Sequence, residues 1–152
     1  MGMGKGTAVN GMERERRYLQ RTVSVLALVP ILGGLSGVIL GPTLTGDTVS
    51  VSFDSQHRFL SALLLAVGIG FMSTVPGIEE KTGRFRLLAF LIFLGGLGRL
   101  FGLMLTGVPS ALMLGGLALE LVVTPILALW QTRVANAYAD TAGIADLTRD
   151  KA

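Results

Sequence analysis

Four long apolar stretches, separated by short polar segments, dominate the sequence. They cover residues 22–41, 59–78, 87–106 and 111–130. Each is about 20 residues long, which at about 1.5 Å per residue allows an α-helix to cross a hydrocarbon core of about 30 Å. The stretches are continuous rather than alternating, and this favours helices over strands. We therefore expect an all-α integral membrane protein built as a four-helix bundle.

The four stretches belong to one predicted membrane domain, residues 21–134, with a polar segment at each end. Residues 1–20 are rich in glycine and basic residues, and we expect a disordered leader there. Residues 135–152 are polar but compatible with a helix, so they predict a partly ordered tail.

The segment before the second stretch has a local pattern of its own. Val49, Val51 and Phe53 alternate with serines, which predicts a short extended piece. Asp54 or Ser55 is then the expected N-cap of the second helix, because such side chains accept hydrogen bonds from the free backbone N–H groups of a first turn.

The basic residues outside the apolar stretches predict the orientation. Eleven of the 13 Lys and Arg residues lie before the first stretch, between the second and third, or after the fourth. Cytoplasmic loops of membrane proteins carry such an excess, so both termini and the leader and tail are predicted to be cytoplasmic. The eleven residues are Lys5, Arg14, Arg16, Arg17, Arg21, Lys81, Arg84, Arg86, Arg133, Arg149 and Lys151.

Composition narrows the function. Only 15% of the residues are charged, against about 25% in soluble domains, and the mean hydropathy is +0.64. There is no cysteine and a single histidine, which excludes disulfides, thiolate nucleophiles and multi-histidine metal sites within one chain. We expect no metal and no cofactor. The net charge of +3 comes from residues that flank the apolar stretches, so it indicates membrane topology and not nucleic-acid binding.

Two charged residues interrupt the apolar stretches: Arg99 in the third and Glu120 in the fourth. A charge at the centre of a membrane helix costs about 2.5–3.5 kcal/mol on insertion scales, so such residues are rarely neutral in function. Arg99 lies about 10 Å before Thr106, and Glu120 about 13 Å after Ala111. The short connection makes the two helices antiparallel neighbours, so the two charges can meet at similar depth.

Two interpretations of this pair stay open. In the first, Arg99 and Glu120 form a structural ion pair that fixes the third helix to the fourth. In the second, they form a binding site, in which either Arg99 binds an anionic headgroup or carboxylate or Glu120 acts as a proton acceptor. Pro125, one turn after Glu120, frees a backbone carbonyl close to the pair.

Small residues recur on single faces of the predicted helices, and small residues let membrane helices pack closely. We expect helix packing at Gly33, Gly37, Gly95, Gly96, Gly102 and Gly116. In the fourth stretch Gly116, Glu120 and Thr124 share one face, which Gln131 extends. Arg99 and Glu120 therefore lie on faces that are predicted to meet other helices.

A second cluster, Asp54, His57 and Arg58, precedes the second stretch on the predicted outer side. Asp54 and His57 resemble an acid–base pair, since residues three apart share a helix face. Asp54 as a helix cap and Arg58 as an interfacial anchor are the alternative interpretation. No recognisable nucleophile motif surrounds these residues, which weighs against an enzyme.

Several motifs together resemble a bacterial family of small four-span membrane proteins known as domain of unknown function 4345. The resemblance covers about residues 21–134 and has no assigned activity. An Arg in the third helix and a Glu in the fourth recur in that family, which by resemblance supports Arg99 and Glu120. We expect the protein to lie in the cytoplasmic (inner) membrane. The motifs are Asp54-x-x-His57-Arg58-Phe59-Leu60-Ser61, Phe85-Arg86-Leu87-Leu88, Leu94-Gly95-Gly96-Leu97-Gly98-Arg99, Pro109-Ser110 and Leu119-Glu120-Leu121-Val122-x-x-Pro125.

Three functions remain in order of preference. The first is a non-enzymatic module that binds a lipid or a protein partner and packs as a homo-oligomer in the bilayer. The second is an oligomeric transporter or channel for a small solute or protons that uses Arg99 and Glu120. The third is an enzyme that uses Asp54, His57 and Arg58; we expect that the protein is not an enzyme.

Overall fold

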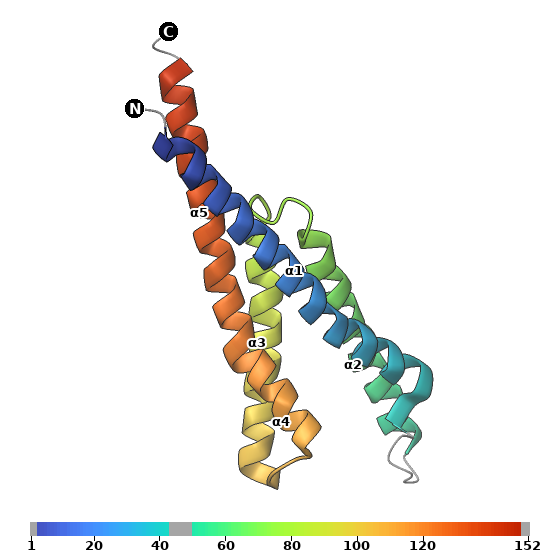
Figure 1. Ribbon diagram of the computed structural model, residues 1–152. Coiled ribbons are helices and arrows are strands. Elements are labelled where there is room, and N and C mark those ends of the chain that lie inside the picture. Colours follow the sequence, from blue (N-terminus) through green and yellow to red (C-terminus); the bar gives the residue numbers. More distant parts are fainter. Residues whose placement is uncertain (1–2, 43–49, 150–152) are drawn as a thin grey trace. The chain divides into compact units, whose positions relative to one another are not determined.

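The computed structural model describes the backbone of residues 3–42 and 50–149, and the side chains of residues 10–42 and 50–143. Over these residues the regular structure is helical (Figure 1). The elements are α1 (Met3–Leu40), α2 (Val51–Thr74), α3 (Thr82–Thr106), α4 (Ala111–Ala118), the π-helical turn η2 (Leu119–Val123) and α5 (Thr124–Arg149).

Four helical stretches are long and apolar enough to cross a membrane. They are Asn10–Leu40, Val51–Thr74, Thr82–Thr106 and Ala111–Gly143, the last of which combines α4, η2 and α5. The predicted all-α fold with four spans is therefore confirmed, and the chain is a multi-pass membrane protein. The cytoplasmic position of both termini stays a prediction.

α1 begins much earlier than the first predicted span. It is helical from Met3, so residues 3–20, expected to be a disordered leader, are ordered instead. The segment around Glu13–Arg17 consists of good helix formers, and Leu19 is completely buried. The leader also makes tertiary contacts, because Arg16 forms an ion pair with Glu79 at 2.9 Å.

α2 also differs from the prediction at both ends. Its N-cap is Ser50, whose side chain accepts a hydrogen bond from the Phe53 backbone N–H, so the expected caps Asp54 and Ser55 are wrong. Val51 and Phe53 are helical rather than extended, while Val49 lies outside the described residues. The helix ends at Thr74, short of the predicted residue 78, because a turn with Gly77 at φ +67° follows.

α3 and the fourth span agree with the sequence at the connection between them. α3 ends at Thr106, as predicted, where Gly107 adopts φ +98°. α4 begins at Ala111, also as predicted. The helix then continues through α5 to Arg149, so most of the expected tail is helical.

The chain divides into two compact units, and the single membrane domain over residues 21–134 stays a prediction. Unit 1 comprises residues 1–20 and 77–152, and unit 2 comprises residues 21–76. In unit 1, Phe85 of α3 and Val134 of α5 are buried between antiparallel helices. In unit 2, α1 and α2 pack through glycine: a Cβ added at Gly34 would lie 2.5 Å from the Leu65 backbone nitrogen. Such close packing is how membrane helices gain contact area.

Candidate functional site

Arg99 of α3 and Glu120 of η2 form an ion pair in unit 1. Arg99 Nε lies 3.2 Å from Glu120 Oε1. The Arg99 side chain is 43% exposed and the Glu120 side chain is 14% exposed, so the pair is open on the arginine side only. Both residues lie within candidate membrane spans, where exposure on the protein surface means exposure to lipid or to another membrane component.

Gly96 brings the two elements close enough for this contact. It is buried in α3, and a Cβ added there would lie 2.8 Å from Glu120 Cβ and 2.7 Å from Leu121 Cδ2. Because real Cβ atoms do not approach so closely, only glycine fits without a shift of η2 or of the Leu121 side chain. Gly96 therefore lies at a close approach between α3 and η2.

Glu120 lies in the π-helical turn, which the sequence did not predict. The Thr124 backbone N–H and its Oγ1 both donate to the Leu119 carbonyl, the Oγ1 at 2.9 Å. Pro125 follows directly and lacks a backbone N–H, so it cannot donate an α-helical hydrogen bond. π-helical turns in α-helices are frequent at functional sites, which makes this turn a further reason to regard Glu120 as a site residue.

The pair leaves hydrogen-bonding groups unused. Arg99 Nη1 donates to Met113 Sδ at 3.1 Å, and Nη2 has no hydrogen-bond partner among the residues that the structure describes. Glu120 Oε2 is buried without a partner in the same part of the chain. Gly116 lies beside the guanidinium, since a Cβ added there would be in ordinary contact with Nη1 at 3.6 Å. The site can therefore accept an anion at Arg99.

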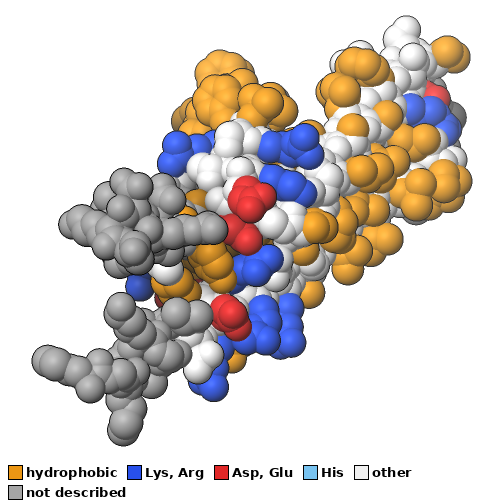
Figure 2. Space-filling model, turned by 90° about the horizontal axis from the view of Figure 1, so that it is seen from above, with side chains coloured by type: hydrophobic (Ala, Val, Ile, Leu, Met, Phe, Trp, Pro, Cys, Tyr) orange, Lys and Arg blue, Asp and Glu red, His pale blue; other side chains and the backbone are white. Residues whose placement is uncertain are grey.

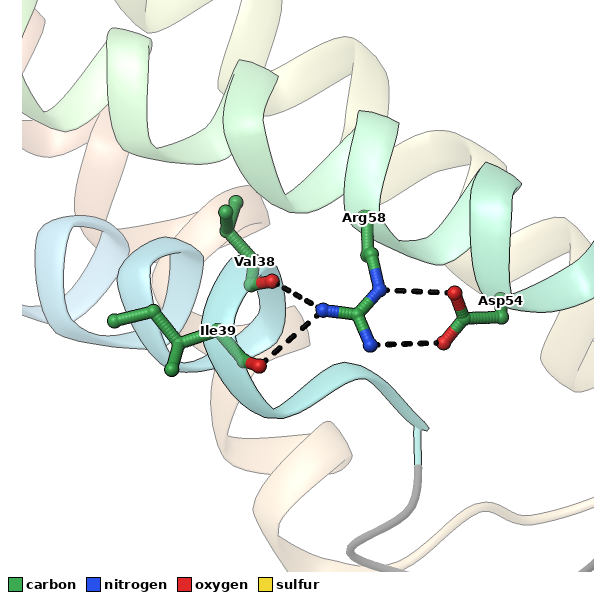
Figure 3. Close-up of polar contacts among 4 residues, drawn as sticks. All are labelled: Val38, Ile39, Asp54 and Arg58. Atoms are coloured by element: carbon green, nitrogen blue, oxygen red, sulfur yellow. Dashed lines mark hydrogen bonds and ion pairs between the residues drawn. The ribbon is translucent and has the colours of Figure 1, made fainter.

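The other predicted cluster is organised around Arg58 in unit 2 (Figure 3). Arg58 Nε and Nη2 donate to the two carboxylate oxygens of Asp54 at 2.9 and 3.2 Å. Its Nη1 donates to the backbone carbonyls of Val38, at 2.5 Å, and Ile39, at 3.2 Å. These carbonyls lie in the last turn of α1, where no intrahelical donor is available. Arg58 thus caps α1, and its role as an interfacial anchor stays a prediction.

This arrangement also changes the interpretation of His57. Arg58 occupies both oxygens of Asp54, so the structure pairs Asp54 with Arg58 rather than with His57. The His57 ring is stacked on Phe53, with the ring centroids 6.3 Å apart. On its other side it approaches Gly37, where an added Cβ would lie 3.3 Å from Nε2. Among the described residues Asp54 is hydrogen-bonded to Arg58 and not to His57, and an acid–base role for Asp54 and His57 stays a prediction.

Only some of the other glycines lie at close contacts between the described helices. A Cβ at Gly37 would collide with Ser61, and one at Gly33 would be in ordinary contact with Leu64. At Gly95 and Gly102 an added Cβ would meet nothing within 4 Å, so these two do not serve packing between the described helices. The α2 glycine Gly68, which the sequence analysis did not single out, is packed: an added Cβ would lie 2.9 Å from the Ile31 backbone nitrogen.

Sequence reasoning missed a polar junction at the other end of unit 1. Gln131 is fully buried and donates to the Ile78 carbonyl at 2.8 Å and to Thr82 Oγ1 at 2.9 Å. Arg16 pairs with Glu79 and lies over the Tyr138 ring, 5.8 Å from its centroid. Figure 2 shows Lys and Arg side chains beside Asp and Glu side chains on the face in view. These contacts join distant segments, which no local pattern reveals.

The comparisons with known proteins give one match. The model of a family described as "Domain of unknown function (DUF4345)" matches residues 18–131, which include Arg99, Glu120 and the Arg58 cluster. Neither the curated proteins nor the solved structures contain a match. The geometry of the site is therefore the main guide to function.

Proposed function

Since the chain belongs to the DUF4345 family, whose description assigns no activity, we propose from the geometry that this membrane protein binds an acidic lipid-like ligand at Arg99 without transforming it. The ligand class is an anionic headgroup that carries an acyl chain. It would reach the site sideways from the bilayer, because the open side of Arg99 faces the surface of unit 1.

The observation that carries this proposal is the incomplete pairing of Arg99. A guanidinium has five N–H donors in a planar fork that matches a carboxylate or a phosphate. One edge of the Arg99 guanidinium consists of Nε and Nη2. Nε lies 3.2 Å from Glu120 Oε1, whereas Nη2 has no partner among the described residues. In hydrocarbon each unused charged donor is costly, so an anion that fills the fork is strongly favoured.

Lipid retention tests the proposal. The wild type, Arg99→Leu and the control Arg86→Leu would be placed in phosphatidylcholine nanodiscs with either oleate or phosphatidylglycerol and examined by native mass spectrometry. Arg86 is an exposed arginine on the same helix that donates to Thr132 Oγ1, so its loss measures general charge effects. We expect bound acidic lipid on the wild type and on Arg86→Leu, and its loss on Arg99→Leu.

The two lipids distinguish the source of the headgroup. Retention of oleate alone indicates a free carboxylate, and retention of phosphatidylglycerol alone indicates a phosphodiester. Equal retention by the wild type and Arg99→Leu would contradict the proposed site.

Transport by an oligomer is the second candidate. Gly95 and Gly102 have nothing within 4 Å of an added Cβ and lie on the same helix as the exposed Arg99. A second copy packed there would line a path that four spans cannot enclose alone. Uptake of a weak acid into liposomes by the wild type, but not by Arg99→Leu, would support this function over simple binding.

A further inference from the structure

We propose that an anion binding at Arg99 displaces Glu120 and that Glu120 then takes up one proton. This inference rests on the proposed function and adds a proton linkage to it. Before binding, the site holds one arginine cation and one glutamate anion. After binding, it holds the arginine cation, the bound anion and a neutral glutamic acid, so the site keeps zero net charge.

The first step of the argument is competition for one edge of the guanidinium. Glu120 uses Nε through a single oxygen, while Nη2 on the same edge is without a partner among the described residues. The other edge of the guanidinium consists of Nη1 and Nη2, and Nη1 already donates to Met113 Sδ at 3.1 Å. A ligand that binds two-pronged, as carboxylates and phosphates do with arginine, fits the Nε–Nη2 edge and must replace Glu120 Oε1 there.

The second step is the isolation of Glu120 from other charges. Its Oε2 is already buried without a donor, and its side chain is only 14% exposed. Among the described side chains of the elements that pack on η2, α4 carries no charge, and α3 carries Arg99 together with Arg84 and Arg86. Arg84 and Arg86, and also Arg133 and Asp140 on α5, lie about 20 Å or more along the helices from the pair.

The third step is the fate of a carboxylate that loses its counter-ion there. A buried charge without a partner is strongly unfavourable in a membrane span, and a carboxyl group in such surroundings is neutralised by a proton. The proton comes from the aqueous phase, and no other group has to change its charge. Binding of one anion is therefore linked to the uptake of one proton.

Calorimetry measures this linkage directly. Octanesulfonate serves as the probe because its headgroup stays ionised over the usual pH range and cannot carry the proton itself. Binding to the full-length protein in phosphatidylcholine nanodiscs would be titrated in Tris and in imidazole, two amine buffers with different ionisation enthalpies. The buffer dependence of the binding enthalpy gives the number of protons taken up.

We expect about one proton per bound sulfonate for the wild type, and an affinity that falls about tenfold for each unit of rising pH. The near-isosteric variant Glu120→Gln keeps the shape of the site, and we expect it to bind without proton uptake and without this pH dependence. Arg99→Leu should abolish binding.

The outcomes separate the two proposals. Wild-type binding without proton uptake would overturn the linkage and leave the anion site intact, as would equal proton uptake by Glu120→Gln. A wild type that does not bind, or that binds no better than Arg99→Leu, would overturn the proposed function and the linkage with it.

Discussion

Gly96 lies directly against Glu120: a Cβ added to the glycine would be 2.8 Å from the glutamate Cβ. The glycine is thus part of the site although it has no functional group. It fixes the distance between α3 and η2, and this distance lets Arg99 reach Glu120.

Gly96→Ala should lower the stability of the protein. Overpacking of a filled interface costs about 1–3 kcal/mol, and here the added methyl group meets two side chains. Gly95→Ala on the same helix is the matched control, because its Cβ would meet nothing within 4 Å. Thermal unfolding in detergent would compare the two, and equal melting temperatures would argue against a close contact at Gly96.

The two halves of the ion pair should respond unequally to removal. Arg99→Leu leaves Glu120, which is only 14% exposed, without a counter-ion, whereas Glu120→Leu leaves an arginine that is 43% exposed. Breaking a buried pair costs about 3–5 kcal/mol, and the open side of Arg99 reduces this value. We expect Arg99→Leu to lower the melting temperature more than Glu120→Leu does.

The double variant completes this experiment. Arg99→Leu with Glu120→Leu removes both charges, so much of the loss in Arg99→Leu should be recovered. Additive losses in the double variant would show that the two side chains do not interact energetically.

Arg58→Lys should loosen the end of α1 although the charge is kept. A lysine ammonium cannot bind Asp54 with two parallel hydrogen bonds and at the same time reach the Val38 and Ile39 carbonyls. We expect faster amide hydrogen exchange in the last turn of α1 and a lower melting temperature. Arg21→Lys, at an exposed arginine of unit 2, is the control. Unchanged exchange in Arg58→Lys would refute the capping role.

Gln131→Leu should lower the stability of the protein where the α2–α3 connection meets the start of α3. The substitution removes the donor to the Ile78 carbonyl and to Thr82 Oγ1 inside a fully buried site. A buried acceptor left unsatisfied costs about 1–3 kcal/mol. Chemical or thermal unfolding would measure this loss, with Asn136→Leu, an exposed amide on α5, as the comparison. A loss of similar size in both variants would contradict the role of Gln131.

The number and position of the spans could be predicted because they depend on hydropathy summed over many residues. The ends of α2 and the start of α1 could not, since they depend on single contacts. Asp54 is a plausible cap from its position, but it is engaged by Arg58, and Ser50 caps α2 instead. In the same way, residues 3–20 lack the hydropathy of a span and are helical because unit 1 supplies partners such as Glu79 for Arg16.

The two residues of the candidate site could be predicted from the sequence, but the details of their surroundings could not. Charges are rare in apolar stretches, so Arg99 and Glu120 stand out in the sequence, and the short connection between α3 and α4 brings them to one depth. Their unequal exposure and the unused Oε2 of Glu120 depend on Gly96 and on side-chain packing. Hydropathy carries no information about either.

The π-helical turn at Leu119–Val123 changes the direction in which the later side chains of the fourth span point. A π turn takes up one more residue than an α turn, so every later side chain is rotated by about 100° relative to an uninterrupted α-helix. The stripe drawn from Gly116 and Glu120 to Gln131 is broken at this turn. Gln131 is directed to Ile78 in the connection between α2 and α3, and Glu120 is directed to Arg99. One inserted residue in effect lets a single helix present two unrelated polar faces.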